Sequence, residues 1–178
     1  LLSLRQKFLS LATKKGPSLK NIEIKNFINT YPNFPKLGIV YRDIAPLLAC
    51  PKTLAFTIKT LSELIEEWNP EVIVAIDSRG FLFATPIAIM HKVGVVMIRK
   101  KNKLPGKLKK KSYDLEYGSS TLEIQSEAKI SNRRVVVIDD LLATGGTLAA
   151  AESLLLDCQA MLTGNMVLIE LVSLHGRN

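Results

Sequence analysis

The chain has 178 residues, a length that suits one domain with a single hydrophobic core. Its formal net charge is +8, and no apolar run reaches the roughly 18 residues that a membrane-spanning helix needs. The basic balance leaves three partner classes open: a nucleic acid, an anionic membrane surface, or a small polyanionic substrate.

The two cysteines, Cys50 and Cys158, lie far apart and lack the spacing of metal ligands or of a redox pair. We interpret both as free thiols in a reducing compartment such as the cytoplasm, with a disulfide as the minor alternative.

Residues 1–22 contain no acidic residue, and their apolar residues recur at helical spacing. This pattern favours an amphipathic helix over residues 3–13 that packs on the domain or on a neighbouring subunit. A targeting peptide is the alternative interpretation. A second helix is predicted over residues 21–30, after a break at Gly16-Pro17.

The rest of the sequence alternates between predicted strands and predicted helices. Residues 31–44 are punctuated by proline and glycine and predict a loop that ends in a short extended piece. Residues 99–111 lack apolar periodicity and predict a mobile loop, and residues 112–125 predict a β-hairpin around Tyr117-Gly118. Helices are predicted over residues 52–68, from DSRGF to about residue 92, and over 145–158; strands are predicted over 72–76, 93–98, 134–138 and 165–174.

This alternation predicts an α/β fold with a mostly parallel sheet that is covered by helices on both faces. Right-handed crossovers place the carboxyl ends of parallel strands at one edge, where ligands bind in such sheets. The segments DSRG (77–80), RKKNK (99–103) and DDLLATGG (139–146) each follow a predicted strand. All three are therefore expected to meet in one crevice.

The segment VVVIDDLLATGGTLAA, residues 135–150, runs from a predicted strand through two carboxylates into a helix that begins near ATGGT. The first turn of a helix presents unpaired N–H groups and the positive end of the helix dipole. Gly145 and Gly146 allow a ligand to approach the backbone, while Thr144 and Thr147 add hydroxyl donors. The pattern predicts an anion cradle that suits a phosphate monoester.

Asp139 and Asp140 would repel a phosphate unless the ligand also carried groups that seek carboxylates. Vicinal sugar hydroxyls and a bound Mg²⁺ both do so. The segment therefore predicts a site for a sugar phosphate such as ribose 5-phosphate. The plain alternative is a helix N-terminus capped by Asp and Thr after a core strand, with no ligand. The sequence contains no Walker A loop and no G-x-G-x-x-G.

The segment VVVIDDLLATGGT resembles the 5-phosphoribosyl-1-pyrophosphate (PRPP) signature of the type I phosphoribosyltransferases. Five further segments resemble the adenine phosphoribosyltransferase family, in the order in which that family has them. These are FPKLGIVYRDIAPLL (34–48), AIDSRGFLF (75–83), IRKKNKLPG (98–106), SYDLEYGSSTLEIQ (112–125) and ELVSLHGR (170–177). The resemblance covers the chain from about residue 30 to its end.

The resemblance implies the type I phosphoribosyltransferase fold, a central mostly parallel sheet flanked by helices, in one domain over residues 1–178. Within that domain we expect a helical extension (1–30), a base-side hood loop (31–50) and a flexible lid loop with an arm (99–125). The implied reaction joins adenine to PRPP and gives AMP and pyrophosphate, with Mg²⁺ held mainly by PRPP and water, near Asp139 and Asp140. A homodimer that binds neither nucleic acid nor membrane is expected.

The resemblance also implies roles for individual residues. Asp139 and Asp140 would hold the ribose hydroxyls, and Glu116 would assist proton transfer at the purine. Val40, Tyr41 and Arg42 would face adenine, and Arg79 would lie near the base as well as near the pyrophosphate. The remaining PRPP or AMP contacts are expected from Ala143, Thr144, Gly145, Gly146, Thr147, Ser78, Arg99, Lys100, Lys103 and Tyr117.

Several alternatives remain open at this point. A phosphoribosyltransferase for hypoxanthine, guanine or xanthine is the nearest, because a few hydrogen bonds select the base. A PRPP-sensing regulatory protein that binds RNA or a partner would suit the basic charge. An inactive relative is the third alternative.

Lys109 to Lys111 are either a solvated charge run or part of the site. We interpret His91 and His175 as surface or packing residues.

Overall fold

The structure, a computed structural model, describes residues 8–10, 23–115 and 118–177. The chain divides into two compact units. The larger comprises Leu61–Asn178 together with Leu1–Lys14, and the smaller comprises Lys15–Thr60. The prediction of one domain over residues 1–178 stays a prediction.

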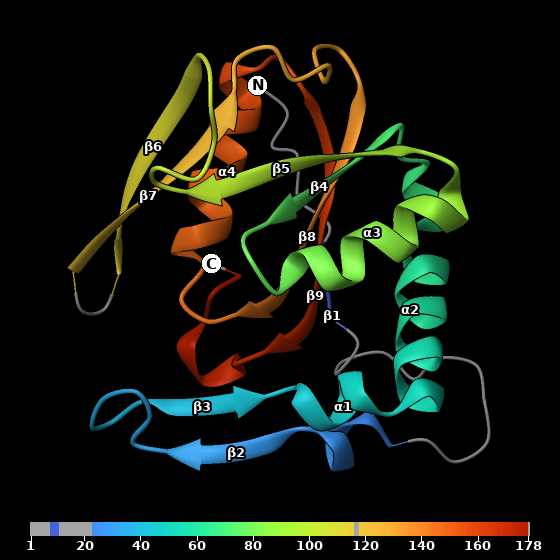
Figure 1. The fold of residues 1–178 in the computed structure, drawn as a ribbon, viewed down its shortest axis with the longest axis vertical. Helices are drawn as coiled ribbons and strands as arrows, with labels where there is room; N and C mark the ends of the chain where they lie inside the picture. The colour runs from blue at the N-terminus through green and yellow to red at the C-terminus, as the bar shows by residue number, and fades with distance from the viewer. Residues whose placement is uncertain (1–7, 11–22, 116–117, 178) are drawn as a thin grey trace. The chain divides into compact units, whose positions relative to one another are not determined.

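A seven-stranded sheet, with strand order β1-β9-β8-β4-β5-β7-β6, forms the centre of the larger unit (Figure 1). Neighbouring strands from β1 to β5 in this order are parallel, and the pairs β5–β7 and β7–β6 are antiparallel. The sheet therefore confirms the prediction of a mostly parallel α/β architecture. Its strands are β1 (Phe8–Ser10), β4 (Val72–Ile76), β5 (Gly94–Lys100), β6 (Leu108–Leu115), β7 (Gly118–Gln125), β8 (Arg134–Leu142) and β9 (Met161–Glu170).

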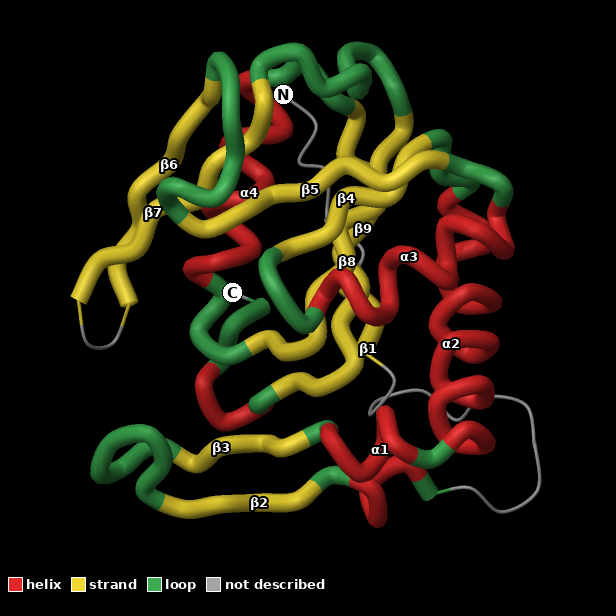
Figure 2. The backbone as a smooth tube through the Cα atoms, viewed as in Figure 1, coloured by secondary structure: helices red, strands yellow, loops and turns green. Residues whose placement is uncertain are grey.

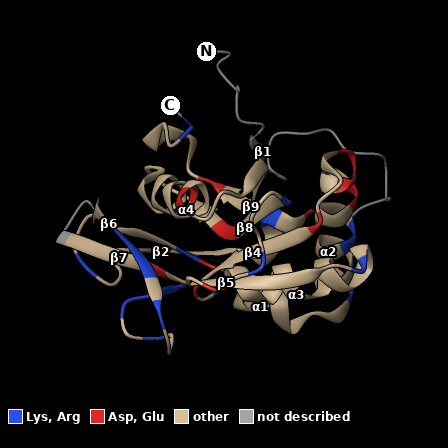
Figure 3. Cartoon of the chain, turned by 90° about the horizontal axis from the view of Figure 1, so that it is seen from above, with Lys and Arg blue, Asp and Glu red and all other residues tan. Residues whose placement is uncertain are grey.

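Helices α3 (Gly80–His91) and α4 (Gly146–Asp157) cover opposite faces of this sheet, as Figures 1 and 3 show. All five residues of β4 are buried, because this strand lies in the middle of the sheet between the two helical layers. The apolar side of α4 packs through Leu148, Leu154 and Leu155 into the main core cluster. The unit is completed by the short 3-10 helices η2 (Glu66–Trp68) and η3 (Val172–Leu174).

A two-stranded antiparallel sheet and short helices build the smaller unit (Figure 2). Strand β2 (Asn29–Pro32) pairs with β3 (Val40–Asp43). The rings of Phe34 and Tyr41 meet edge to face at 5.2 Å between their centroids. The 3-10 helix η1 (Ile24–Phe27) precedes the hairpin, and α1 (Ala45–Ala49) and α2 (Pro51–Ile65) follow it. Helix α2 continues from this unit into the larger one.

Two N-terminal predictions are wrong where the structure describes them. Phe8–Ser10 forms strand β1, paired with β9, and not part of a helix over residues 3–13. Of the predicted helix over residues 21–30, the described part, from residue 23, holds the short 3-10 helix Ile24–Phe27, and β2 begins at Asn29. Thr30 and Tyr31 favour extended backbone, and Pro32 disfavours helix in the residue before it.

Three further boundaries differ from the sequence-based expectation. Residues 31–44 contain the end of a second strand, β2, besides the expected extended piece, which is β3. The predicted loop over residues 99–111 contains the ends of β5 and β6, since a lysine-rich edge strand shows no apolar pattern. The last strand runs over 161–170 and not 165–174, because its pairing with β8 ends at Glu170.

Candidate active site

The carboxyl ends of strands β4, β5 and β8 bring the three predicted segments to one edge of the sheet. These strands are parallel and in register, with Ile76 beside Ile98 and Ala75 beside Ile138. The residues that follow each strand are therefore neighbours across the edge. The predicted convergence of DSRG, RKKNK and DDLLATGG is confirmed in this respect.

Asp139 and Asp140 extend β8 at this edge and are both buried, with 8% and 7% of their surface exposed. The backbone N–H of Asp140 donates a hydrogen bond of 2.8 Å to Asp139 Oδ1. Burial, and next the charge of Asp140, raise the pKa of Asp139 well above its ordinary value. Two buried carboxylates this close require hydrogen-bond donors or cations from a ligand or from the protein.

Arg79 provides one such cation. Its Nη2 lies 2.5 Å from Asp140 Oδ2, and its side chain is partly exposed. Sequence reasoning assigned Arg79 to the pyrophosphate and the base and missed this ion pair with the aspartates. The only available signal was that DSRG and DDLL follow adjacent strands. Ser78, predicted beside Arg79, is exposed.

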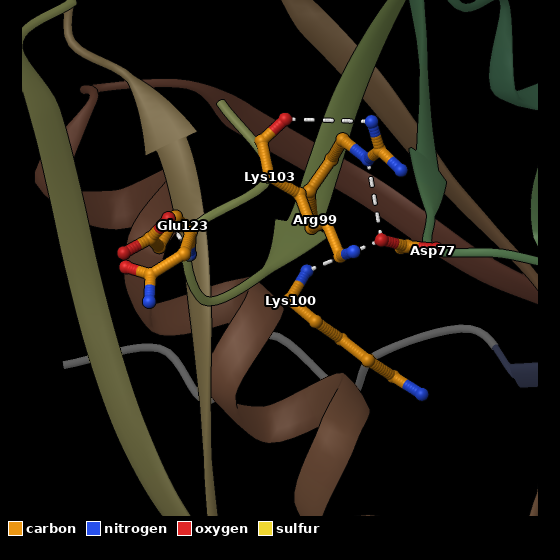
Figure 4. A network of polar contacts seen from close by, with 6 residues as sticks. Asp77, Arg99, Lys100, Lys103 and Glu123 are labelled. Atoms are coloured by element: carbon orange, nitrogen blue, oxygen red, sulfur yellow. Dashed lines mark hydrogen bonds and ion pairs between the residues drawn. The ribbon is translucent and has the colours of Figure 1, made fainter. Parts of the chain in front are cut away.

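Asp77 organises the ends of β4 and β5, as Figure 4 shows. Its Oδ2 accepts hydrogen bonds from Arg99 Nε at 3.2 Å and from the N–H of Lys100 at 3.4 Å. Arg99 also donates through Nη1 to the carbonyl oxygen of Lys103, at 3.4 Å. The predicted cations Arg99, Lys100 and Lys103 are thereby tied together by Asp77, which sequence reasoning did not single out.

Glu123 of β7 fixes the turn that follows β5 (Figure 4). This fully buried carboxylate accepts a 2.9 Å hydrogen bond from the N–H of Asn102 and lies 2.9 Å from Lys110 Nζ. The hydrogen bond from Lys110 is the largest of the causes that lower the pKa of Glu123. The turn that carries Lys103 is thus anchored to the antiparallel part of the sheet.

The predicted phosphate cradle lies in the turn that leads into α4. Gly145 is the N-cap at φ 89°, a left-handed conformation that favours glycine, and no side chain caps the helix. The N–H groups of the first turn therefore lack the side-chain acceptor that commonly caps a helix. Ala143, Gly146 and Thr147 are half-buried, and Thr144 is exposed.

The C-terminal HGR segment lies directly against this turn. A Cβ atom on Gly145 would come within 2.5 Å of the carbonyl oxygen of Gly176, and one on Gly176 would collide with that of Ala143. Arg177 forms a two-pronged ion pair with Glu170, with contacts of 2.6 and 2.5 Å. Sequence reasoning quoted this segment as family-like and gave it no role.

The lysine run resolves into residues with distinct partners. Lys109 Nζ donates to the carbonyl oxygen of Asp157, the last residue of α4, and Lys110 pairs with Glu123. Figure 3 shows basic residues along β6, to which these lysines belong. The interpretation of Lys109 and Lys110 as part of a fully solvated charge run is therefore wrong.

Other predicted residues fall elsewhere. Val40, Tyr41 and Arg42 form part of β3 in the smaller unit, where Arg42 Nη1 donates to Thr30 Oγ1 at 2.5 Å. Glu116 and Tyr117 lie outside the described residues. His91 packs between helices, with Nε2 at 3.0 Å from Ser62 Oγ, which confirms a packing role, and His175 is exposed.

Among the described residues no three His, Cys, Asp or Glu side chains form a metal-binding group. Within the same parts of the chain no helix is both long and apolar enough to cross a bilayer. Cys50 and Cys158 are free thiols, as predicted.

Comparison with known proteins agrees with this geometry. The phosphoribosyl transferase domain family matches residues 45–177. An adenine phosphoribosyltransferase of Rhodospirillum centenum is 46% identical over 157 residues, which cover 88% of this chain and 92% of that protein.

Two solved structures are also similar. The adenine phosphoribosyltransferase of Thermoanaerobacter pseudethanolicus matches with a TM-score of 0.84 and 41% identity, over 86% of this chain and 90% of that one. The Saccharomyces cerevisiae enzyme, solved with adenine and an imino-altritol bisphosphate, matches with a TM-score of 0.80 and 39% identity, over 86% and 90%. The chain therefore belongs to the phosphoribosyl transferase family and, within it, to the adenine phosphoribosyltransferases.

Proposed function

We propose that this chain transfers the 5-phosphoribosyl group of PRPP to adenine and releases AMP and pyrophosphate, in a Mg²⁺-dependent step of purine salvage. The observation that carries the proposal is a buried aspartate pair that directly precedes a glycine-rich helix N-terminus without a side-chain cap. A sugar diol beside a phosphate satisfies both features at once. The names of the relatives support adenine as the base.

We assign the ribose and its 5-phosphate to the end of β8 and the start of α4. Asp139 and Asp140 accept hydrogen bonds from the two ribose hydroxyls, which replace solvent at these buried carboxylates. The N–H groups from Gly145 to Thr147, with the hydroxyls of Thr144 and Thr147, bind the phosphate. Ala143 contributes backbone to the same turn.

We assign the pyrophosphate to the cations that follow β4 and β5. Arg99, Lys100 and Lys103 offer positive charge to a leaving group of high negative charge, and Ser78 offers a hydroxyl. Because Asp77 holds Arg99 and the backbone of Lys100, these donors are positioned before the substrate arrives. Arg79 stays with Asp140 or turns to the substrate as the ribose hydroxyls bind.

The site residues fit Mg²⁺ that is held mainly by the substrate. Mg²⁺ commonly uses one or two carboxylates, several waters and substrate phosphates, so a site without three protein carboxylates is sufficient. Asp139 and Asp140 would hold it, directly or through water, and the ion pair of Arg79 with Asp140 Oδ2 would give way if that oxygen bound the ion. When bound there, Mg²⁺ would supply positive charge that helps pyrophosphate to leave.

In the chemical step, the bond between the anomeric carbon and pyrophosphate breaks as N9 of adenine bonds to that carbon. The protein's main contributions are positioning and charge stabilisation of an oxocarbenium-like state. Adenine loses its N9 proton, and we assign Glu116 as the group that assists this transfer, with Tyr117 beside it. Adenine recognition is assigned to Val40, Tyr41 and Arg42.

A base panel tests this function. The purified chain is incubated with PRPP, Mg²⁺ and adenine, hypoxanthine, guanine or xanthine, and nucleotide formation is followed. We expect AMP from adenine and a much lower rate with the other bases. Turnover of another purine instead would keep the PRPP site and overturn the base assignment. PRPP binding without any turnover would support the sensor or the inactive relative.

We also infer that the chain forms a homodimer through the outer face of α3. This helix contains no Lys, Arg, Asp or Glu, and it is apolar on both sides. A helix that is apolar all round is normally buried all round. Two copies of a chain of net charge +8 repel one another, so an uncharged face is where a second copy can approach. The exposed apolar residues on and beside this face are Leu82, Ile89, Met90, Val95 and Met97.

A single substitution tests the dimer. Ile89→Lys places a charge where the side chain is 72% exposed, and Leu156→Lys on α4 is a matched control at 71% exposure. We expect light scattering to report a dimer for the wild type and for the control, and a monomer for Ile89→Lys. A monomeric wild type, or a dimer in all three, would contradict the proposal.

We further propose a cytoplasmic location and no nucleic-acid partner. The free thiols of Cys50 and Cys158 support a reducing compartment. Two of the lysines of β6 have partners within the protein, which supports a structural role for them over RNA binding. An RNA gel shift at submicromolar protein that disappears with salt would contradict this part of the proposal.

A further inference from the structure

Tyr113 connects the β6–β7 hairpin to the turn that we assign to the 5-phosphate. Thr147 Oγ1 donates a hydrogen bond of 3.3 Å to the hydroxyl oxygen of Tyr113. Thr147 belongs to the first turn of α4, and Tyr113 to β6, which is 34 residues earlier in the sequence. The contact is thus a tertiary one between two elements of the larger unit.

The Tyr113 hydroxyl is held in a fixed place. Its half-buried ring packs against the main core cluster, which includes Leu148, Ala151 and Leu154 of α4. At the other end of β6, Lys109 Nζ donates to the carbonyl oxygen of Asp157. Strand β6 is therefore attached to α4 at both ends of the helix, and the ring has little freedom to move.

The direction of the hydrogen bond determines what Tyr113 can do. A hydroxyl has one donor and two acceptor positions. When Thr147 donates to Tyr113, the Tyr113 hydroxyl keeps its own proton for an acceptor nearby, and the lone pairs of Thr147 are turned in a defined direction. A phosphate in the α4 turn supplies acceptor oxygens only. Binding then reorients the pair so that a hydroxyl proton faces the ligand.

We propose that Tyr113 is a positioning residue for the 5-phosphate: when Thr147 turns its proton to that phosphate, the Tyr113 hydroxyl donates to Thr147 Oγ1 in its place and holds the Thr147 side chain in the binding arrangement. This inference rests on the proposed function, since it assumes a phosphoribosyl ligand at the α4 turn. Because the Tyr113 hydroxyl already lies beside Thr147 Oγ1, ordering the Thr147 side chain against the phosphate costs less than it would for a side chain that rotates freely. Tyr113 therefore contributes to affinity for the phosphate end of the substrate and not for the pyrophosphate end.

The test compares two ligands and four variants. Binding of ribose 5-phosphate and of pyrophosphate is measured by calorimetry for Tyr113→Phe, Thr147→Ala, the double variant and Ser112→Ala. Tyr113→Phe keeps the ring and its packing and removes only the hydroxyl. Ser112→Ala is the matched control, because it removes a neighbouring hydroxyl that contacts Thr121 within the hairpin.

We expect Tyr113→Phe to weaken ribose 5-phosphate binding about five- to tenfold and to leave pyrophosphate binding within about twofold. In the Thr147→Ala background the same change should add little, because the residue through which Tyr113 acts is gone. In steady state, the KM for PRPP should rise more than kcat falls. Ser112→Ala should bind both ligands as the wild type does.

Three outcomes would overturn the inference: unchanged ribose 5-phosphate affinity in Tyr113→Phe, an equal loss for pyrophosphate, or a full additional loss in the double variant. Failure of the proposed function gives a different result. In that case ribose 5-phosphate would not bind the wild type, or Thr147→Ala would bind it normally.

Discussion

Asp139 is the residue where the demands of the site and of the fold conflict most clearly. Its carboxyl is buried beside Asp140, and both conditions raise its pKa. A carboxyl group whose pKa is higher in the folded state does not oppose folding while it is protonated, at pH values below its unfolded pKa of about 4. As pH rises beyond that value, ionisation increasingly opposes folding, so at neutral pH this group costs stability.

We therefore expect Asp139→Asn to stabilise the protein and to impair its function. At pH 7 the free energy of unfolding should rise by about 1 kcal/mol, and the gain should shrink as pH falls toward about 4. The affinity for PRPP should fall, because a donor and acceptor amide replaces an acceptor at the ribose hydroxyls. Urea unfolding at several pH values measures the first effect. A destabilised variant at pH 7 would refute this account of the buried pair.

Glu123 differs from Asp139 in that its buried carboxylate has a cationic partner, Lys110, and its pKa is lowered. The hydrogen bond from Lys110 lowers the pKa of Glu123, so the pair contributes stability above the unfolded pKa of about 4.3. This contribution is lost as pH falls through the folded pKa. The carboxylate is fully buried, whereas Lys110 is about half exposed, and solvent screens its charge.

For Lys110→Met we expect a loss on the order of 1 kcal/mol at pH 7 that disappears at acidic pH. Lys111→Met removes an equal charge from the next residue of β6, which is exposed, and serves as the control. Thermal or urea unfolding of both variants at pH 7 and near pH 3.5 checks the expectation. Equal stability losses in the two variants would show that the net charge matters and the specific pair does not.

At the scale of elements, the C-terminal segment supports the phosphate turn. Gly176 is buried, and a methyl group there would collide with the carbonyl of Ala143 and come near Leu142 and the N–H of Gly145. Gly176→Ala should thus displace the turn that leads into α4. We expect a stability loss of about 1–3 kcal/mol and a raised KM for PRPP.

Gly164→Ala is the matched control for this change. Its added Cβ would come within 2.7 Å of the Trp68 ring, away from the phosphate turn. We expect a comparable loss of stability with an unchanged KM for PRPP at temperatures where the variant is folded. Unaltered kinetics in Gly176→Ala would mean that the HGR segment does not support the turn.

Elements also show how far the sequence alone could go. The buried strand β4 was predicted with its bounds, because VIVAI is a continuous apolar run before DSRG. The first half of strand β6, residues 108–111, was predicted as loop, because its lysines contact the end of α4 and Glu123 and so follow no apolar period. The N-terminal helix failed because strand pairing with β9 outweighed helical spacing over Phe8–Ser10.

The candidate site also contains residues that the sequence could predict and contacts that it could not. Residues at the carboxyl ends of parallel strands, such as Asp139 and Arg99, were predictable because parallel topology places them at one edge. The ion pair between Arg79 and Asp140, and the contact of Tyr113 with Thr147, depend on distances between segments that no local pattern encodes.

At the scale of the whole molecule, the net charge of +8 should act on substrate capture. PRPP is a polyanion and adenine is neutral, so added salt should weaken only the attraction for PRPP. We expect the KM for PRPP to rise several-fold between about 0.05 and 0.3 M salt, with little change in the KM for adenine. A parallel rise in both KM values would point to a general effect of salt on the enzyme.

The central claim is that one edge of the sheet binds a phosphoribosyl group in a defined orientation. A crystal structure of the protein with PRPP and Mg²⁺ tests it most directly. We expect the 5-phosphate on the first turn of α4, the ribose hydroxyls on Asp139 and Asp140, and the pyrophosphate near Arg99 and Lys100. PRPP bound with its ribose away from the aspartates, or with its 5-phosphate on the β5 cations, would show that the proposed orientation is wrong.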